Sequence, residues 1–216
     1  MNEKCSLVFT GGEGPVVKPL LFDKYPYSRI IAADSGYDTA RKLSMKIDDA
    51  VGDFDSSQYR DELIAEGFVP CPRDKDYSDS ELALMRLDTT CYDLAGGGGA
   101  RLDHLLSLTG LFPKYGYPRF WFTRTDLIIT IKNASVIFSL PPGSDISFMT
   151  LEEKAAVSCS HLVWPLDSFV LSRTSVSLSN RNSERVLDIS ACGIVLCRVD
   201  ISNADCVTES FKIYGN

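Results

Sequence analysis

Acidic side chains in the first half of the chain have the types and spacing to hold a metal ion. Asp53 and Asp55 stand two residues apart at the end of an apolar run. On an extended segment such residues face the same way, about 6–7 Å apart. Adding Asp34, Asp76 and Asp79 would build a negative charge that a fold tolerates only with compensation. A hard divalent cation such as Mg²⁺, which prefers oxygen ligands, would supply that compensation.

Glycines and basic residues accompany these carboxylates. Gly11 and Gly12 follow the first apolar run, and four consecutive glycines occupy positions 96–99. Glycine-rich loops let backbone amides approach an anion closely. Lys75 and Arg101 would bring fixed positive charge to a polyphosphate. Carboxylates, a metal ion, glycine loops and an arginine together indicate phosphoryl-type transfer.

Short apolar strands alternate with amphipathic helices through residues 1–123. Strands are predicted at residues 6–10, 29–34, 50–55, 68–72, 90–95 and 119–123, and helices at 37–45, 58–66, 80–87 and 104–114. Ser78 and Glu81 have capping-box spacing, which marks the start of the third helix. The alternation predicts a doubly wound, mostly parallel sheet. Polar residues follow almost every strand, so they should meet at the carboxyl edge, where such folds bind ligands.

The pattern changes after residue 123. Short β-rich runs follow one another at residues 128–131, 135–138, 146–149, 155–157, 169–171, 176–179, 186–189 and 194–199. Regular runs separated by turn residues predict a small β-sandwich. We therefore expect an α/β protein of two domains, 1–123 for nucleotide binding and catalysis and 124–216 as the β-sandwich.

Composition excludes several classes of protein. A net charge of −7 without a basic stripe disfavours nucleic-acid partners and anionic membrane surfaces. No apolar run is long enough for a signal segment or a membrane span, so a cytoplasmic location is expected. Only two histidines occur, which argues against a His-rich metal centre. The seven cysteines form no CxxC pair and are expected to be reduced, buried thiols.

Several of these residues also have simpler interpretations. Asp34 and Asp79 could be helix caps. Lys75 could be a solvated neighbour of acidic residues. His104 is more often a hydrogen-bonding residue at a helix start than a catalyst. Trp164 is expected to pack in a core or an interface.

Four segments, in this order, resemble the nucleotide domain of the thiamin pyrophosphokinase family. They read Ala-Asp-Ser-Gly at 33–36, Gly-Asp-Phe-Asp-Ser at 52–56, Lys-Asp-Tyr-Ser-Asp at 75–79 and Gly-Gly-Ala-Arg-Leu-Asp-His at 98–104. Residues 162–166 and 177–180 are similar to the family's Gly-Leu-x-Tyr-Pro-Leu and Ser-x-Ser-Asn segments. The resemblance spans about residues 8–200. Ser35, Ala100 and His161 depart from it, and no aromatic residue for the thiamin rings follows Asn180.

The resemblance implies a magnesium-dependent enzyme that transfers pyrophosphate from ATP to the thiamin hydroxyl, giving thiamin diphosphate and AMP. It also implies a homodimer, with each site between one subunit's α/β domain and its partner's β-sandwich. The implied catalytic residues are Asp53, Asp55, Asp79 and Arg101, the three aspartates being the Mg²⁺ ligands. The implied ATP-binding residues are Gly11, Gly12, Asp34, Lys75, Asp76, Ser78, Gly98, Arg101, Asp103 and His104. The implied thiamin-binding residues are Ser177, Ser179 and Asn180.

Two alternatives come from other classes of protein. The Asp53-Phe54-Asp55 segment also resembles the nucleophile motif of haloacid-dehalogenase-like phosphatases, although that motif normally ends the first strand and here ends the third. A non-catalytic nucleotide sensor could use the same glycines without chemistry. Both rank below the kinase.

Overall fold

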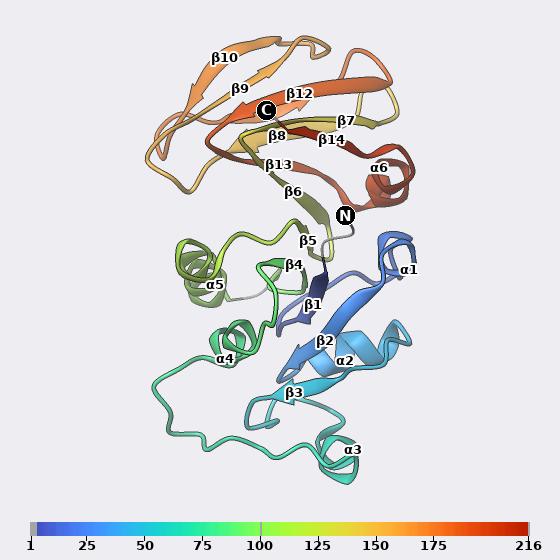
Figure 1. The fold of residues 1–216 in the computed structure, drawn as a ribbon, viewed down its shortest axis with the longest axis vertical. Helices are drawn as coiled ribbons and strands as arrows, with labels where there is room; N and C mark the ends of the chain where they lie inside the picture. The colour runs from blue at the N-terminus through green and yellow to red at the C-terminus, as the bar shows by residue number, and fades with distance from the viewer. Residues whose placement is uncertain (1–3, 100, 216) are drawn as a thin grey trace. The chain divides into compact units, whose positions relative to one another are not determined.

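The chain divides into two compact units, each visible in Figure 1. The computed structural model describes residues 4–99 and 101–215. The first unit runs through Lys18 and from Phe22 to Thr125, and the second comprises Pro19–Leu21 and the chain from Asp126 onward. Helices, parallel strands and antiparallel strands all occur, so the chain is a mixed α/β protein, as its sequence predicts.

Five parallel strands form the sheet of the first unit, in the order β5-β4-β1-β2-β3. Their bounds are β1 Cys5–Phe9, β2 Tyr27–Ala33, β3 Asp49–Val51, β4 Cys91–Ala95 and β5 Phe120–Phe122. β1 and β5 are buried along their whole length. Such continuous burial is typical of parallel strands covered on both faces.

Helices cover both faces of this sheet. Their bounds are α1 Leu21–Lys24, α2 Gly36–Lys42, α3 Arg60–Ala65, α4 Asp79–Met85 and α5 Leu102–Tyr115. The chain runs from β1 through β2 to β3 and then returns past β1 to β4 and β5. Right-handed crossovers therefore place α2 on one face and α4 and α5 on the other, as Figure 1 shows. The direction of winding reverses between β1 and β4, the point at which such sheets bind ligands.

The predicted strand at residues 68–72 is wrong. This stretch is irregular and connects α3 to α4. Pro70 and Pro72 lack the backbone N–H that a ladder requires. One hydrogen bond, from Cys71 N to Gly52 O at 2.7 Å, ties the stretch to the end of β3.

Two antiparallel sheets make up the second unit. One has the order β11-β8-β13-β6, with bounds Ser177–Arg181, Asp145–Met149, Ile194–Asp200 and Asp126–Lys132. The other has the order β10-β9-β12-β7-β14, with bounds Leu166–Leu171, Ala155–Cys159, Val186–Cys192, Ala134–Ser139 and Lys212–Gly215. Burial alternates along β6, β7 and β12, as expected of sheets that bury one face. The buried faces meet where β12 packs against β6 and β9 against β13.

Each of the eight strands predicted in this half is present. Three elements near its end were not predicted: the 3₁₀ turn η1 (Ile201–Asn203), α6 (Ala204–Ser210) and β14. No helix among the described residues is long and apolar enough to cross a membrane.

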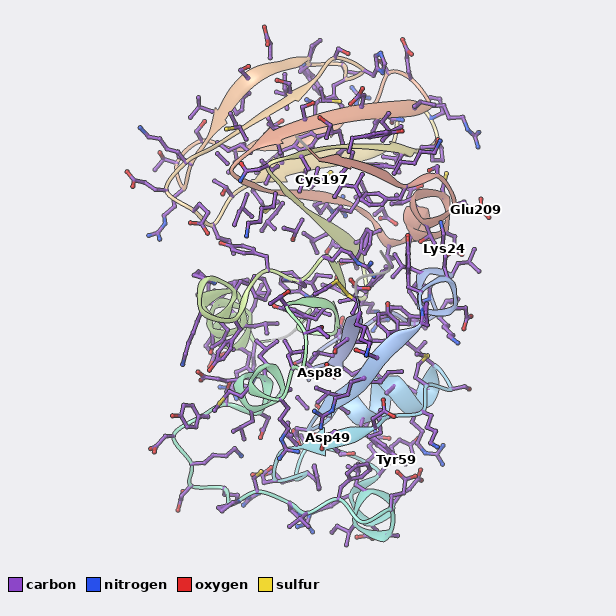
Figure 2. All side chains as sticks on the ribbon, viewed as in Figure 1. Lys24, Asp49, Tyr59, Asp88, Cys197 and Glu209 are labelled. Atoms are coloured by element: carbon purple, nitrogen blue, oxygen red, sulfur yellow. A yellow bond between two sulfur atoms is a disulfide. The ribbon has the colours of Figure 1, made fainter. Side chains whose placement is uncertain are left out.

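The cysteines depart from expectation at one pair. Cys5 and Cys91 are directly opposite each other on β1 and β4, and a disulfide joins them. The prediction that all seven thiols are reduced is therefore wrong for these two. The other five cysteines are free. Among them Cys197 on β13 is fully buried within the second unit (Figure 2).

Candidate active site

A cavity of about 460 Å³ opens in the first unit at the carboxyl edge of its parallel sheet. It is lined by the ends of β1 and β2, the loop after β4, the start of α4 and the first turns of α5. Its lining includes eight residues that the sequence predicts for the site: Gly11, Gly12, Asp34, Ser78, Asp79, Gly98, Arg101 and His104.

Two glycine loops form one wall of this cavity and are bonded to each other. Gly97 N donates to Gly11 O at 2.8 Å, and Glu13 N donates to Gly98 O at 2.7 Å. A side chain at Gly96 would place its Cβ 2.2 Å from Thr10 O. Glycine is therefore required where these loops meet. The result is a wall of backbone, which can approach a phosphate closely.

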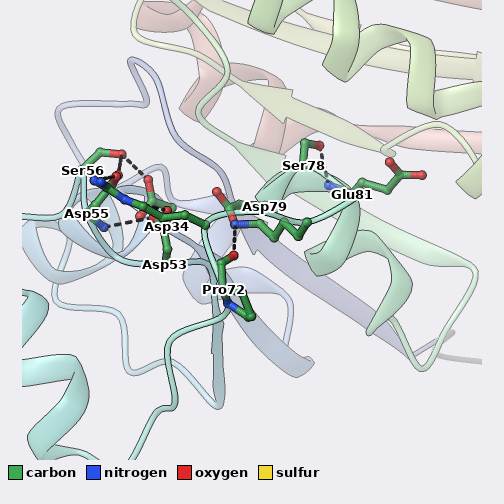
Figure 3. Close-up of polar contacts among 10 residues, drawn as sticks. Asp34, Asp53, Asp55, Ser56, Pro72, Ser78, Asp79 and Glu81 are labelled. Carbon is green, nitrogen blue, oxygen red and sulfur yellow. Dashed lines mark hydrogen bonds and ion pairs between the residues drawn. The ribbon is translucent and has the colours of Figure 1, made fainter.

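Three carboxylates gather at the ends of β2 and β3. Ligand oxygens of Asp34, Asp53 and Asp55 lie within 4.8 Å of one another, and Figure 3 shows them together with Ser56. Asp53 and Asp55 follow β3 in a loop, so their predicted place on an extended strand is wrong. Asp55 N donates to Asp53 Oδ1 at 3.2 Å. Between them Phe54 is fully buried with a positive φ of 60°, which anchors the loop.

Asp34 has one carboxylate oxygen with no hydrogen-bond partner. Ser56 donates to its Oδ2, while its Oδ1 is buried and unpaired. Burial raises the pKa of Asp34 above its ordinary value, with the negative charges of Asp79 and Asp53 adding to the shift and the bond from Ser56 opposing it. A buried oxygen without a hydrogen-bond partner is rare in proteins, and binding of an ion at that oxygen is one common reason for it.

This donor set fits a hard divalent cation. Asp34, Asp53 and Asp55 offer only oxygen atoms, which Mg²⁺ prefers. In that arrangement the unpaired Oδ1 of Asp34 would bind the cation. Asp79, the third predicted metal ligand, does not belong to this group, although it is near enough to raise the pKa of Asp34.

Two basic side chains of the α3–α4 connection, Arg73 and Lys75, form ion pairs with aspartates of the site. Arg73 donates a hydrogen bond to Asp55 Oδ2, and its Nε lies 3.7 Å from Asp53 Oδ2. The hydrogen bond from Arg73 lowers the pKa of Asp55. Lys75 Nζ lies 3.0 Å from Asp79 Oδ1, an ion pair without hydrogen-bond geometry. Lys75 therefore contacts the site through Asp79, rather than lining the cavity.

The start of α4 closes the cavity on another side. Ser78 Oγ accepts a bond from Glu81 N at 3.2 Å, which confirms the predicted cap. The Glu81 carboxylate, however, binds Lys114 and Tyr115. Thr10 and Ser80 share a hydrogen bond of 2.5 Å between their hydroxyls, which ties β1 to α4.

Arg101 and His104 line the cavity from the start of α5. Arg101 donates two hydrogen bonds to Asp103, at 3.2 and 2.6 Å. These bonds lower the pKa of Asp103 to about 2. Asp103 and Asp76 are exposed and do not line the cavity. Ala100, where the sequence departs from the family pattern, lies outside the described residues.

The predicted thiamin-binding residues lie on β11 in the second unit. Asn180 is buried, and its amide bonds the backbone N and O of Trp164, at 3.2 and 2.8 Å. Ser179 is exposed with a positive φ of 52°. Trp164 is 56% exposed rather than packed in this unit's core, and the Arg181 guanidinium stacks over its ring.

Several side chains of the cavity were not predicted from the sequence. They belong to Thr10, Glu13, Ala33, Ser35, Ser56, Ser80, Ser107 and Leu108. Most stand next to predicted residues at strand ends. Ser107 and Leu108 follow His104 by three and four positions, the spacing of one helix face, so that periodicity could have found them. No sequence pattern indicated that Arg73 belongs to the site.

Several solved structures have a fold similar to that of this chain. No family model matches the sequence, and no curated protein matches it. A thiamin pyrophosphokinase from Geobacillus thermodenitrificans is 22% identical, with a TM-score of 0.69 over 94% of this chain and 99% of that one. The Bacillus subtilis enzyme is 21% identical, with a TM-score of 0.71 over 91% and 99%. The Candida albicans enzyme is 14% identical, with a TM-score of 0.67 over 91% and 90%. Over nearly its whole length, the chain has the fold of thiamin pyrophosphokinases.

Proposed function

We propose that this chain is a thiamin pyrophosphokinase, which transfers the pyrophosphoryl group of Mg-ATP to the hydroxyl of thiamin and yields thiamin diphosphate and AMP. One observation carries the proposal: three carboxylates meet beside a glycine-walled cavity, in a fold shared with thiamin pyrophosphokinases. The order of acidic and glycine motifs supports the same reaction.

ATP would bind along the glycine wall. Gly11, Gly12 and Gly98 would offer backbone to the phosphates, with Ser78 and His104 at the same cavity. Asp34, Asp53 and Asp55 would hold Mg²⁺, with the unpaired oxygen of Asp34 among the ligands, and Asp79 would lie nearby outside this group. Bound there, Mg²⁺ would neutralise polyphosphate charge and orient the phosphates.

In the proposed reaction the thiamin hydroxyl oxygen forms a bond to the β-phosphorus of ATP. The bond from that phosphorus to the oxygen bridging the α-phosphate breaks, and AMP leaves with that oxygen. Arg101 would neutralise charge that grows on the polyphosphate. A carboxylate of the acidic group would accept the hydroxyl proton. Positioning carries most of the catalysis, because phosphoryl transfer needs little covalent help from the protein.

Thiamin would bind at β11, through Ser177, Ser179 and Asn180. Asn180 bonds the backbone of Trp164, and the exposed indole of that residue offers a ring surface for the vitamin. In this proposal the enzyme is a homodimer, and each site combines the first unit of one subunit with the second unit of its partner. We place the reaction in the cytoplasm, where ATP is available.

The proposal is tested by incubating the purified chain with thiamin and Mg-ATP and separating the products by chromatography. Thiamin diphosphate and AMP in equal amounts are expected. Thiamin monophosphate with ADP would contradict the proposal, because it would mean transfer of a single phosphoryl group. Tight ATP binding without turnover of thiamin would point instead to a nucleotide sensor.

A further inference from the structure

Arg73 contacts both carboxylates of the loop that follows β3. It donates a hydrogen bond to Asp55 Oδ2, and its Nε lies 3.7 Å from Asp53 Oδ2. The Oδ1 atoms of both aspartates are used locally, since Asp53 Oδ1 accepts from Asp55 N and Asp55 Oδ1 accepts from Ser56 Oγ at 3.3 Å. Arg73 therefore holds the two oxygens that the loop itself leaves available.

The charges explain why a guanidinium is found there. Asp34, Asp53 and Asp55 bring three carboxylates within 4.8 Å of one another, and such a group needs positive charge nearby. Arg73 supplies one such charge from a side chain that remains 74% exposed. An ion pair this exposed is weak, so a divalent cation with several carboxylate ligands can displace it.

We propose that Arg73 is an internal counterion of Asp53 and Asp55, and that it competes with the divalent cation for these two carboxylates. When the cation binds, the guanidinium is released from both carboxylates. Arg73 thus sets the cation concentration at which the site fills. This inference rests on the proposed function only in taking these carboxylates as the cation site.

Lys75 supports this view through a parallel arrangement. It lies two residues further along the same connection, and its ammonium is 3.0 Å from Asp79 Oδ1. Two basic side chains of this connection thus pair with acidic residues of the site, Arg73 with Asp53 and Asp55 and Lys75 with Asp79. Arg73 differs from Lys75 in reaching both members of the Asp53 and Asp55 pair.

The test is a titration of the full chain with Mn²⁺ alone, without nucleotide, following the free Mn²⁺ signal by electron paramagnetic resonance. Arg73→Gln should lower the dissociation constant about twofold to fivefold, because exposed ion pairs contribute about that factor. Arg60→Gln is the matched control. Arg60 and Arg73 both line a surface pocket of about 390 Å³ that also includes Asp53 and Asp55. Among the described residues, however, Arg60 forms no ion pair with either aspartate. This variant should change the constant less than about twofold.

Two further measurements keep the outcomes distinct. Circular dichroism checks that each variant is folded. Asp55→Asn should weaken Mn²⁺ binding about tenfold or more. If Asp55→Asn binds Mn²⁺ like the wild type, the cation assignment in the proposed function fails. If Asp55→Asn weakens binding but Arg73→Gln leaves the constant unchanged or raises it, only the role of Arg73 is overturned.

Discussion

Ser56 donates a hydrogen bond to Asp34 Oδ2, joining the loop after β3 to the end of β2. The same segments are bonded through the backbone, from Asp34 N to Val51 O at 2.7 Å. Asp34 adopts a positive φ of 47°, which turns the chain from β2 into α2. The side-chain bond therefore sets which carboxylate oxygen remains unpaired beside Asp53 and Asp55.

Removing that hydroxyl should weaken the site. Ser56→Ala is expected to lower kcat/KM for thiamin about tenfold, because partners that orient metal ligands typically contribute 10- to 100-fold. Ser56→Thr, which keeps a hydroxyl, should retain most of the activity. Steady-state kinetics at saturating Mg-ATP measure both. Equal activity of Ser56→Ala and the wild type would show that this bond does not position Asp34.

The carboxylate group itself should be needed for turnover and not for folding. Asp55→Asn removes one negative charge from an exposed position and is expected to lower kcat by about 100-fold or more, the effect of losing a key electrostatic group. The thermal midpoint should stay close to that of the wild type. Asp74→Asn is the control, because Asp74 is an exposed acidic residue of the same connection outside the carboxylate group. Near-native kcat in Asp55→Asn would remove this residue from the catalytic set.

The disulfide between Cys5 and Cys91 should stabilise the first unit. It closes a loop with a sequence separation of 86 residues, and cross-links of this kind contribute about 2–4 kcal/mol by restricting the unfolded chain. Reductant should therefore lower the free energy of unfolding in urea by roughly that amount. A Cys91→Ser variant should show no response to reductant. Identical wild-type denaturation curves with and without reductant would mean that the bond contributes nothing.

Because Arg101 is bonded to Asp103, we expect the Asp103 carboxyl to titrate at an unusually low pH. Arg101 lowers the pKa of Asp103 to about 2, below the ordinary value of about 3.9. A carboxyl with a depressed folded-state pKa stabilises the protein fully above its unfolded pKa, and this contribution is lost as the pH falls from about 4 toward 2. Arg101→Gln should raise the pKa of Asp103 toward its ordinary value. Carboxyl NMR titration measures the change, and an unaltered low pKa in the variant would refute the pairing.

Much of the fold could be predicted because burial follows local pattern. Continuous apolar runs identified β1, β4 and β5, and alternating runs identified the strands of the second unit. The prediction of a strand at residues 68–72 was wrong because it gave more weight to the apolar residues than to Pro70 and Pro72. Each proline lacks the backbone N–H that a strand needs for its hydrogen bonds. α6 and β14 are too short to show a clear period.

The site was predictable where a residue follows a strand directly. Asp34 and the first glycine loop were found because parallel strands end at one edge. Asp53 and Asp55 were placed correctly near that edge, but on the wrong kind of segment. Arg73 could not be found from sequence, because its contact with Asp55 spans 18 residues through an irregular connection. The role of Asn180 in holding Trp164 likewise depends on a contact 16 residues away.

The most direct measurement follows the β-phosphorus of ATP. The purified chain is incubated with Mg²⁺, thiamin and ATP labelled with ³²P at the β-position, and the products are separated. Label should appear in thiamin diphosphate, none should appear in AMP, and Asp55→Asn should abolish its transfer. Label recovered only in ADP, with Asp55→Asn behaving like the wild type, would contradict pyrophosphoryl transfer at this carboxylate site.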